Sequence, residues 1–103
     1  MAEKHFFEIL TEETPGINKA FFDLVGALQK DGGLDAKTFQ LVYIAIKATV
    51  GEIGAVAAHA GMAKKAGATR EEVRGAVLIT MMTNGVHGIS TCLAAALDAY
   101  DKA

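Results

Sequence analysis

The spacing of the apolar residues constrains the fold of this 103-residue chain more than any other feature of its sequence. Apolar side chains recur every three or four residues, as in Ile17, Phe21, Leu24 and Leu28, so they line one face of a helix. No run alternates apolar with polar residues for long enough to predict a strand. With one proline and no Gly/Ser linker, the sequence predicts a single all-α domain over residues 1–103.

Composition and charge exclude several classes of function. The ten basic and twelve acidic residues are spread along the chain and provide no basic surface for nucleic acid or an anionic membrane. The apolar stretches are interrupted well short of the roughly 20 residues that a membrane-spanning helix needs. Because Cys92 is the only cysteine and no signal-peptide pattern is present, we expect a soluble cytoplasmic protein.

Cap and turn signals divide the chain into helices. The predicted helices cover residues 3–10, 15–30, 36–50 and 52–66, followed by one from the cap at residue 69 to residue 100. Asp35 is a predicted N-cap, Gly51 a predicted hinge, and Thr69 with Glu72 a predicted capping box. We expect the last helix to break at Asn84–Gly85 and again near Gly88.

One predicted helix carries polar residues that packing alone would not choose. Glu52 and His59 are two helical turns apart, so they share a face with their Cα atoms roughly 10.5 Å apart along the axis. Only small apolar side chains such as Ala55 lie between them. This face therefore has room for water or a small ligand between an acid and a base.

The preceding helix supplies a matching polar stripe. Gln40, Tyr43 and Lys47 recur at three- and four-residue spacing. If the two helices fold back around Gly51 as a central antiparallel hairpin, Gln40 and Tyr43 approach His59, and Lys47 lies nearer Ala55. The hairpin is then a candidate pocket with an acid, a base and amide or phenol donors.

A second polar stripe lies in the last third of the chain. On a continuous helix its members share one face: Thr80, Thr83, Asn84, His87 and Thr91. Such a stripe lines either a cavity or a subunit contact. His87 is its only titratable member, and we include it among the candidate substrate-binding residues.

Three segments resemble the core of the carboxymuconolactone decarboxylase and alkyl hydroperoxidase D family. These are Leu34–Thr38, then His59, then Ala66–Val73, and the similarity extends over about residues 34–100. The peroxidase branch has a glutamate, a Cys-x-x-Cys pair and a histidine. By this resemblance the histidine falls on His59, whereas Gln40, Glu52 and Ala55 replace the glutamate and the two cysteines.

These replacements predict that the chain is not a thiol peroxidase. That chemistry needs one thiolate to attack the peroxide and a second thiol to resolve the sulfenic acid, and neither Glu52 nor Ala55 supplies one. We expect no thiol-dependent turnover of peroxide in a peroxidase assay. Thiol-dependent turnover that persists in the Cys92→Ser variant would contradict this.

The decarboxylase branch does not depend on the cysteine pair. Similarity to it implies lyase-like acid–base chemistry on a small carboxylated lactone or a related molecule, with His59, Glu52 and Gln40 as catalytic candidates. Tyr43 and Ala55 would line the substrate site. The resemblance also implies a helical homo-oligomer, a trimer or a hexamer, and we expect neither a metal nor a cofactor.

Each candidate has a simpler explanation that the sequence leaves open. His59 is alternatively a buried histidine bonded to the backbone, and Glu52 a favourable charge in the first turn of its helix. Lys47 and its polar neighbours alternatively form a solvated face, His87 caps a helix break, and Cys92 fills the core. The alternative for the whole chain is a catalytically silent ligand-binding or structural oligomer.

Overall fold

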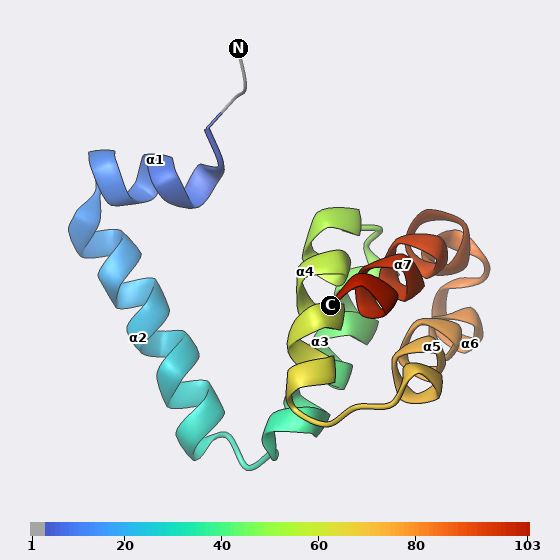
Figure 1. Ribbon diagram of the computed structural model, residues 1–103. Helices are drawn as coiled ribbons and strands as arrows, with labels where there is room; N and C mark the ends of the chain where they lie inside the picture. Colours follow the sequence, from blue (N-terminus) through green and yellow to red (C-terminus); the bar gives the residue numbers. More distant parts are fainter. Residues whose placement is uncertain (1–3) are drawn as a thin grey trace. The chain divides into compact units, whose positions relative to one another are not determined.

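The computed structural model describes residues 4–103, which divide into two compact units, one ending at Leu34 and the other covering residues 35–103. Figure 1 shows that both units are built from helices, and no strand occurs over residues 4–103. The predicted all-α class is confirmed. No helix in this part of the chain is both long and apolar enough to cross a membrane.

The first unit consists of α1 (Phe6–Glu13) and α2 (Pro15–Asp31). The helix predicted over residues 3–10 begins later and ends later than expected, and its first predicted residue lies outside the described part. Proline occupies the first position of α2, as predicted, since its fixed φ suits a helix start. Phe7 of α1 packs against Phe21 and Phe22 of α2, with ring centroids 5.8 and 5.0 Å apart.

The second unit contains α3 (Ala36–Thr49), α4 (Ile53–Lys65), α5 (Arg70–Leu78), α6 (Thr80–Asn84), the π-helix η1 (Ile89–Leu93) and α7 (Ala94–Lys102). In this unit α4 packs against α3 on one side and α7 on another, and α5 packs against α3 and α7. Fully buried side chains from four of these elements meet in the core: Ile44, Val56, Val73, Val77 and Cys92. The alternative that Cys92 is a core residue is therefore the one observed.

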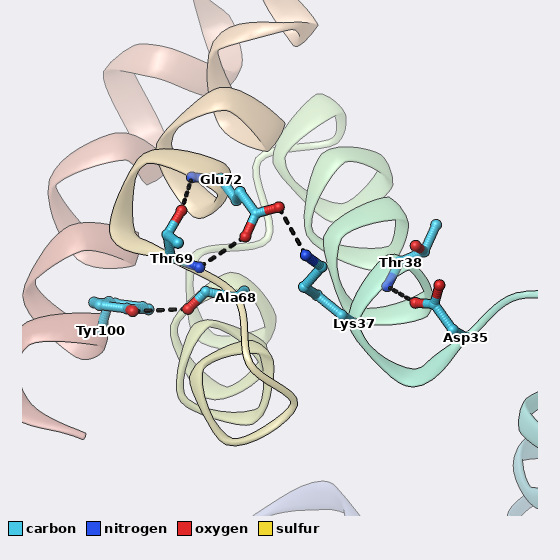
Figure 2. Close-up of polar contacts among 7 residues, drawn as sticks. All are labelled: Asp35, Lys37, Thr38, Ala68, Thr69, Glu72 and Tyr100. Atoms are coloured by element: carbon cyan, nitrogen blue, oxygen red, sulfur yellow. Dashed lines mark hydrogen bonds and ion pairs between the residues drawn. The ribbon is translucent and has the colours of Figure 1, made fainter.

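Two predicted N-caps form as expected (Figure 2). The carboxylate of Asp35 accepts a 2.7 Å hydrogen bond from the backbone N–H of Thr38 at the start of α3. At the start of α5, the N–H of Glu72 donates to Thr69 Oγ1 at 3.1 Å, and the N–H of Thr69 donates to Glu72 Oε1 at 2.9 Å. This reciprocal pair is the capping box that the sequence predicted.

Polar contacts also join the elements of the second unit to one another (Figure 2). Lys37 Nζ of α3 donates to Glu72 Oε2 at 3.0 Å, and the hydroxyl of Tyr100 donates to the Ala68 carbonyl at 2.7 Å. The bond from Thr69, followed by that from Lys37, lowers the pKa of Glu72. The ionised Glu72 carboxylate therefore stabilises the folded protein above its unfolded-state pKa of 4.5. This stabilisation is lost as the pH falls through the lower pKa of Glu72 in the folded state.

The last third of the chain differs from the expectation of a long helix with two glycine breaks. The break at Gly85 is confirmed, because this residue has φ +63°. The break near Gly88 is wrong: this residue is helical, with φ −64° and ψ −33°, and is buried. A Cβ there would lie 2.6 Å from Thr80 Oγ1 and 2.9 Å from the Ala48 carbonyl oxygen, so the glycine permits close packing.

The polar stripe predicted for this region required a continuous helix and is also wrong. The chain turns at Gly85, so no single helix carries the five residues. Four of its five side chains donate hydrogen bonds to backbone carbonyls instead. Thr80 donates to the carbonyl of Val77 and Thr83 to that of Thr80. Asn84 donates to the carbonyl of Thr49 and Thr91 to that of His87. These residues therefore satisfy the backbone around the turn.

Candidate functional site

The packing of α3 against α4 brings His59 against Gln40. Nδ1 of His59 lies 2.7 Å from Oε1 of Gln40, whose side chain is buried, with 8% of the residue exposed. Because an amide oxygen can only accept, the ring nitrogen facing it carries the proton. The second nitrogen, Nε2, therefore keeps its lone pair and is available as a base or a ligand.

Three further polar side chains continue from this pair along the contact between the two helices. The ring of Tyr43 stacks on that of His59, with centroids 3.6 Å apart and planes 19° apart. Lys47 Nζ lies 5.9 Å from the Tyr43 ring centroid and 3.8 Å from Glu52 Oε1. We call the five residues Gln40, His59, Tyr43, Lys47 and Glu52 the polar row.

The environment of His59 favours the neutral imidazole. Burial, followed by the positive charge of Lys47, lowers its pKa from the ordinary value of 6.5. The imidazole is therefore neutral at pH 7 and has a lone pair with which to accept a proton. This combination of a fixed tautomer and a lowered pKa is the arrangement expected of a general base.

The structure brings some of the predicted site residues together and leaves others apart. Gln40 and Tyr43 contact His59 directly, as the folding-back of the two helices predicted. Glu52 is exposed and pairs with Lys47 rather than contacting His59. Ala55 is partly buried on α4 between Glu52 and His59.

His87 lies at a different place from the polar row. Its imidazole packs over Gly51 in the turn between α3 and α4, where a Cβ on the glycine would be 2.6 Å from Nε2 of His87. Gly51 also has φ +76°, so the turn needs glycine for two reasons. No hydrogen bond, ring stack or ion pair found over residues 4–103 joins His87 to the polar row.

Lys47 is the member of the polar row whose surroundings were hardest to predict from the sequence. Its spacing assigns it to a polar stripe but leaves open that it lies on a solvated face. One signal was present: Lys47 is four residues after Tyr43 on the same helix, and the Gly51 turn returns the chain towards it at Glu52. The ion pair with Glu52 depends on how tightly that turn closes.

Introducing a carboxylate at position 40 is expected to reverse the direction of the pKa shift of His59. In the Gln40→Glu variant a negative charge would lie beside Nδ1, and an opposite charge at this distance favours the protonated ring. The pKa of His59 should rise by about 1 to 3. NMR titration of the imidazole checks this.

Gln40→Leu is the matched control, since it occupies similar space without a charge. In this variant the pKa of His59 is expected to stay below 6.5, because burial and Lys47 still act on it. A pKa that does not change in a folded Gln40→Glu protein would contradict the contact between residues 40 and 59.

One of the comparisons with known proteins assigns the chain to a family. No curated protein and no solved structure matches the chain significantly. The model of the carboxymuconolactone decarboxylase family matches residues 15–98, which include every residue of the polar row. The chain therefore belongs to the carboxymuconolactone decarboxylase family.

Proposed function

We propose that the chain carries out acid–base chemistry on a small carboxylated molecule, with His59 as the proton acceptor, Glu52 as the proton donor and Gln40 as the residue that orients the imidazole. α3 and α4 form, in this proposal, a central antiparallel hairpin that holds the site. The supporting observation is the 2.7 Å contact between Gln40 Oε1 and His59 Nδ1, which leaves Nε2 as the basic atom.

The simplest reaction that this arrangement supports is a proton transfer. Nε2 of His59 takes a proton from a carbon beside a carbonyl group, and the electron pair of the C–H bond moves towards the carbonyl oxygen to give an enolate. The imidazolium then returns the proton. In a decarboxylation, a C–C bond breaks instead, carbon dioxide leaves, and the carbon that keeps the electron pair takes a proton, for which Glu52 is the candidate donor.

We also propose that the protein works as a homo-oligomer, a trimer or a hexamer. Large apolar side chains of α6 and the turn after it are exposed in the single chain, Met82 at 87% and Val86 at 67%. Surfaces of this kind are usually covered by a partner.

A screen of small lactones, keto acids and carboxylates tests the proposal. Turnover is measured for the parent protein and for His59→Ala, and the mass of each is measured by light scattering. Turnover that disappears in an intact His59→Ala oligomer supports the enzyme. Thermal stabilisation by a ligand without turnover supports the silent binding oligomer, and neither effect supports a structural one.

A further inference from the structure

We infer that Lys47 is the anchor for a carboxylate that the substrate keeps through the reaction, and that Glu52 occupies this place when no substrate is bound. The inference rests on the proposed function and adds to it a binding residue and a competitor. It follows from three observations on Lys47: its position relative to the base, its weak pairing and its partial burial.

Lys47 and His59 approach the same aromatic ring. The imidazole stacks on Tyr43 at 3.6 Å between centroids, and Lys47 Nζ lies 5.9 Å from that ring's centroid, within the range of a cation–π contact. The ammonium and the imidazole therefore both lie beside the ring of Tyr43. A small anion bound to Lys47 would have its neighbouring carbon atoms close to the base.

The ion pair between Lys47 and Glu52 is loose. Its N–O distance of 3.8 Å is the longest among the ion pairs of residues 4–103, of which Lys37–Glu72 at 3.0 Å is a typical one. Lys47 Nζ also donates no hydrogen bond to any described residue at 3.5 Å or less. An ammonium has three donors, so Lys47 can bind a substrate carboxylate at the cost of one long contact.

Lys47 is also the least exposed charged side chain among these ion pairs, at 33%. A carboxylate that pairs with a partly buried ammonium is screened less by water and salt than one on an open surface. Glu52, at 56%, is the more exposed partner of the pair, so it can leave the ammonium without losing contact with water. A substrate carboxylate can therefore take the place of Glu52 beside the ammonium.

The chemistry restricts which carboxylate can be held. A carboxylate that leaves as carbon dioxide loses its charge during the reaction, so an ammonium paired with it would stabilise the ground state and slow the step. Lys47 must therefore hold a different group, one that keeps its charge throughout.

Binding of succinate, compared with the uncharged succinamide, tests this inference on the full-length oligomer by calorimetry. We expect succinate and not succinamide to bind the parent protein, and Lys47→Met to weaken succinate binding at least about tenfold, with Lys47→Arg retaining most of it. Glu52→Gln should tighten binding several-fold, because the competing carboxylate is gone. Lys65→Met, on the exposed side of α4, is the matched control and should bind as the parent does.

NMR titration of His59 gives a second readout that a purely structural role of Lys47 would not change. Because Lys47 lowers the pKa of His59, neutralising its charge with succinate should raise that pKa in the parent protein and leave it unchanged in Lys47→Met. Lys47→Met alone should raise it as well. Equal succinate binding by Lys47→Met and the parent, or no binding by the parent, would overturn the inference.

These outcomes are separate from those of the proposed chemistry. Turnover that depends on His59 but has an unchanged KM in Lys47→Met would contradict the role of Lys47 and would still support the acid–base function. Succinate binding that depends on Lys47, in a protein without turnover, would contradict the acid–base function and would still support the anion site.

Discussion

Gly88→Ala is expected to lower the free energy of unfolding by about 2 kcal/mol, although alanine is the better helix former. Gly88 is buried and helical, and a Cβ there would lie 2.6 Å from Thr80 Oγ1 and 2.9 Å from the Ala48 carbonyl oxygen. Thr80 is itself buried and bonded to the Val77 carbonyl at 2.7 Å, so it has little space to retreat. Urea denaturation followed by circular dichroism measures the effect.

Gly75→Ala is the matched control, because Gly75 lies inside α5 and a Cβ there meets nothing within 4 Å. This variant should raise the free energy of unfolding by up to about 1 kcal/mol, through helix propensity alone. The same substitution is thus expected to have opposite signs at the two positions. Equal effects would show that Gly88 is not in close contact with α3 and α6.

The helix boundaries of the central region could be predicted because their signals are local. The predicted helix at residues 36–50 differs from α3 by one residue at its end, and the predicted helix at residues 52–66 differs from α4 by one residue at each end. Asp35 and Thr69 each bond to a backbone N–H three residues later, and such bonds depend on neighbouring sequence only. Gly51 and Gly67, with φ of +76° and +97°, similarly fix turns by their own conformation.

Apart from its capping box and the break at Gly85, the last third could not be predicted, because its signals depend on distant residues. Gly85 and Gly88 look alike in the sequence, yet one breaks a helix and the other allows the chain to pack closely against Ala48 of α3. Which role a glycine takes depends on a partner far away in sequence. The interruption at Ile79 carries neither glycine nor proline, and no sequence signal distinguishes it from a continuous helix.

In the site, too, the sequence predicts which helix faces meet but not the individual side-chain contacts. Periodicity and a turn at Gly51 were sufficient to bring Gln40 and Tyr43 near His59, since these depend only on which faces meet. The 3.8 Å approach of Lys47 to Glu52 depends on side-chain conformations beside the turn, which periodicity does not determine. The position of His87 over Gly51 depends on the unpredicted path of the last third.

His59→Ala is expected to lower kcat/KM for the substrate found by the screen by about 10²- to 10⁴-fold, the usual contribution of a general base. The loss follows from removing Nε2, the one basic atom that the Gln40 contact leaves free. In the parent protein the rate should fall on the acid side, as the imidazole gains a proton. Because the pKa of His59 is lowered, this fall should occur below pH 6.5, and Lys47→Met should move it to higher pH.

His5→Asn is the matched histidine control for this loss. His5 lies in the first unit, where its Nδ1 accepts a 3.2 Å hydrogen bond from the Phe7 N–H at the start of α1, and asparagine can make an equivalent cap. The variant should therefore keep both the parent activity and the acid-side fall below pH 6.5. A His59→Ala protein that keeps the parent rate and pH profile would contradict the role of His59, because no other histidine contacts Gln40 and Tyr43 in residues 4–103.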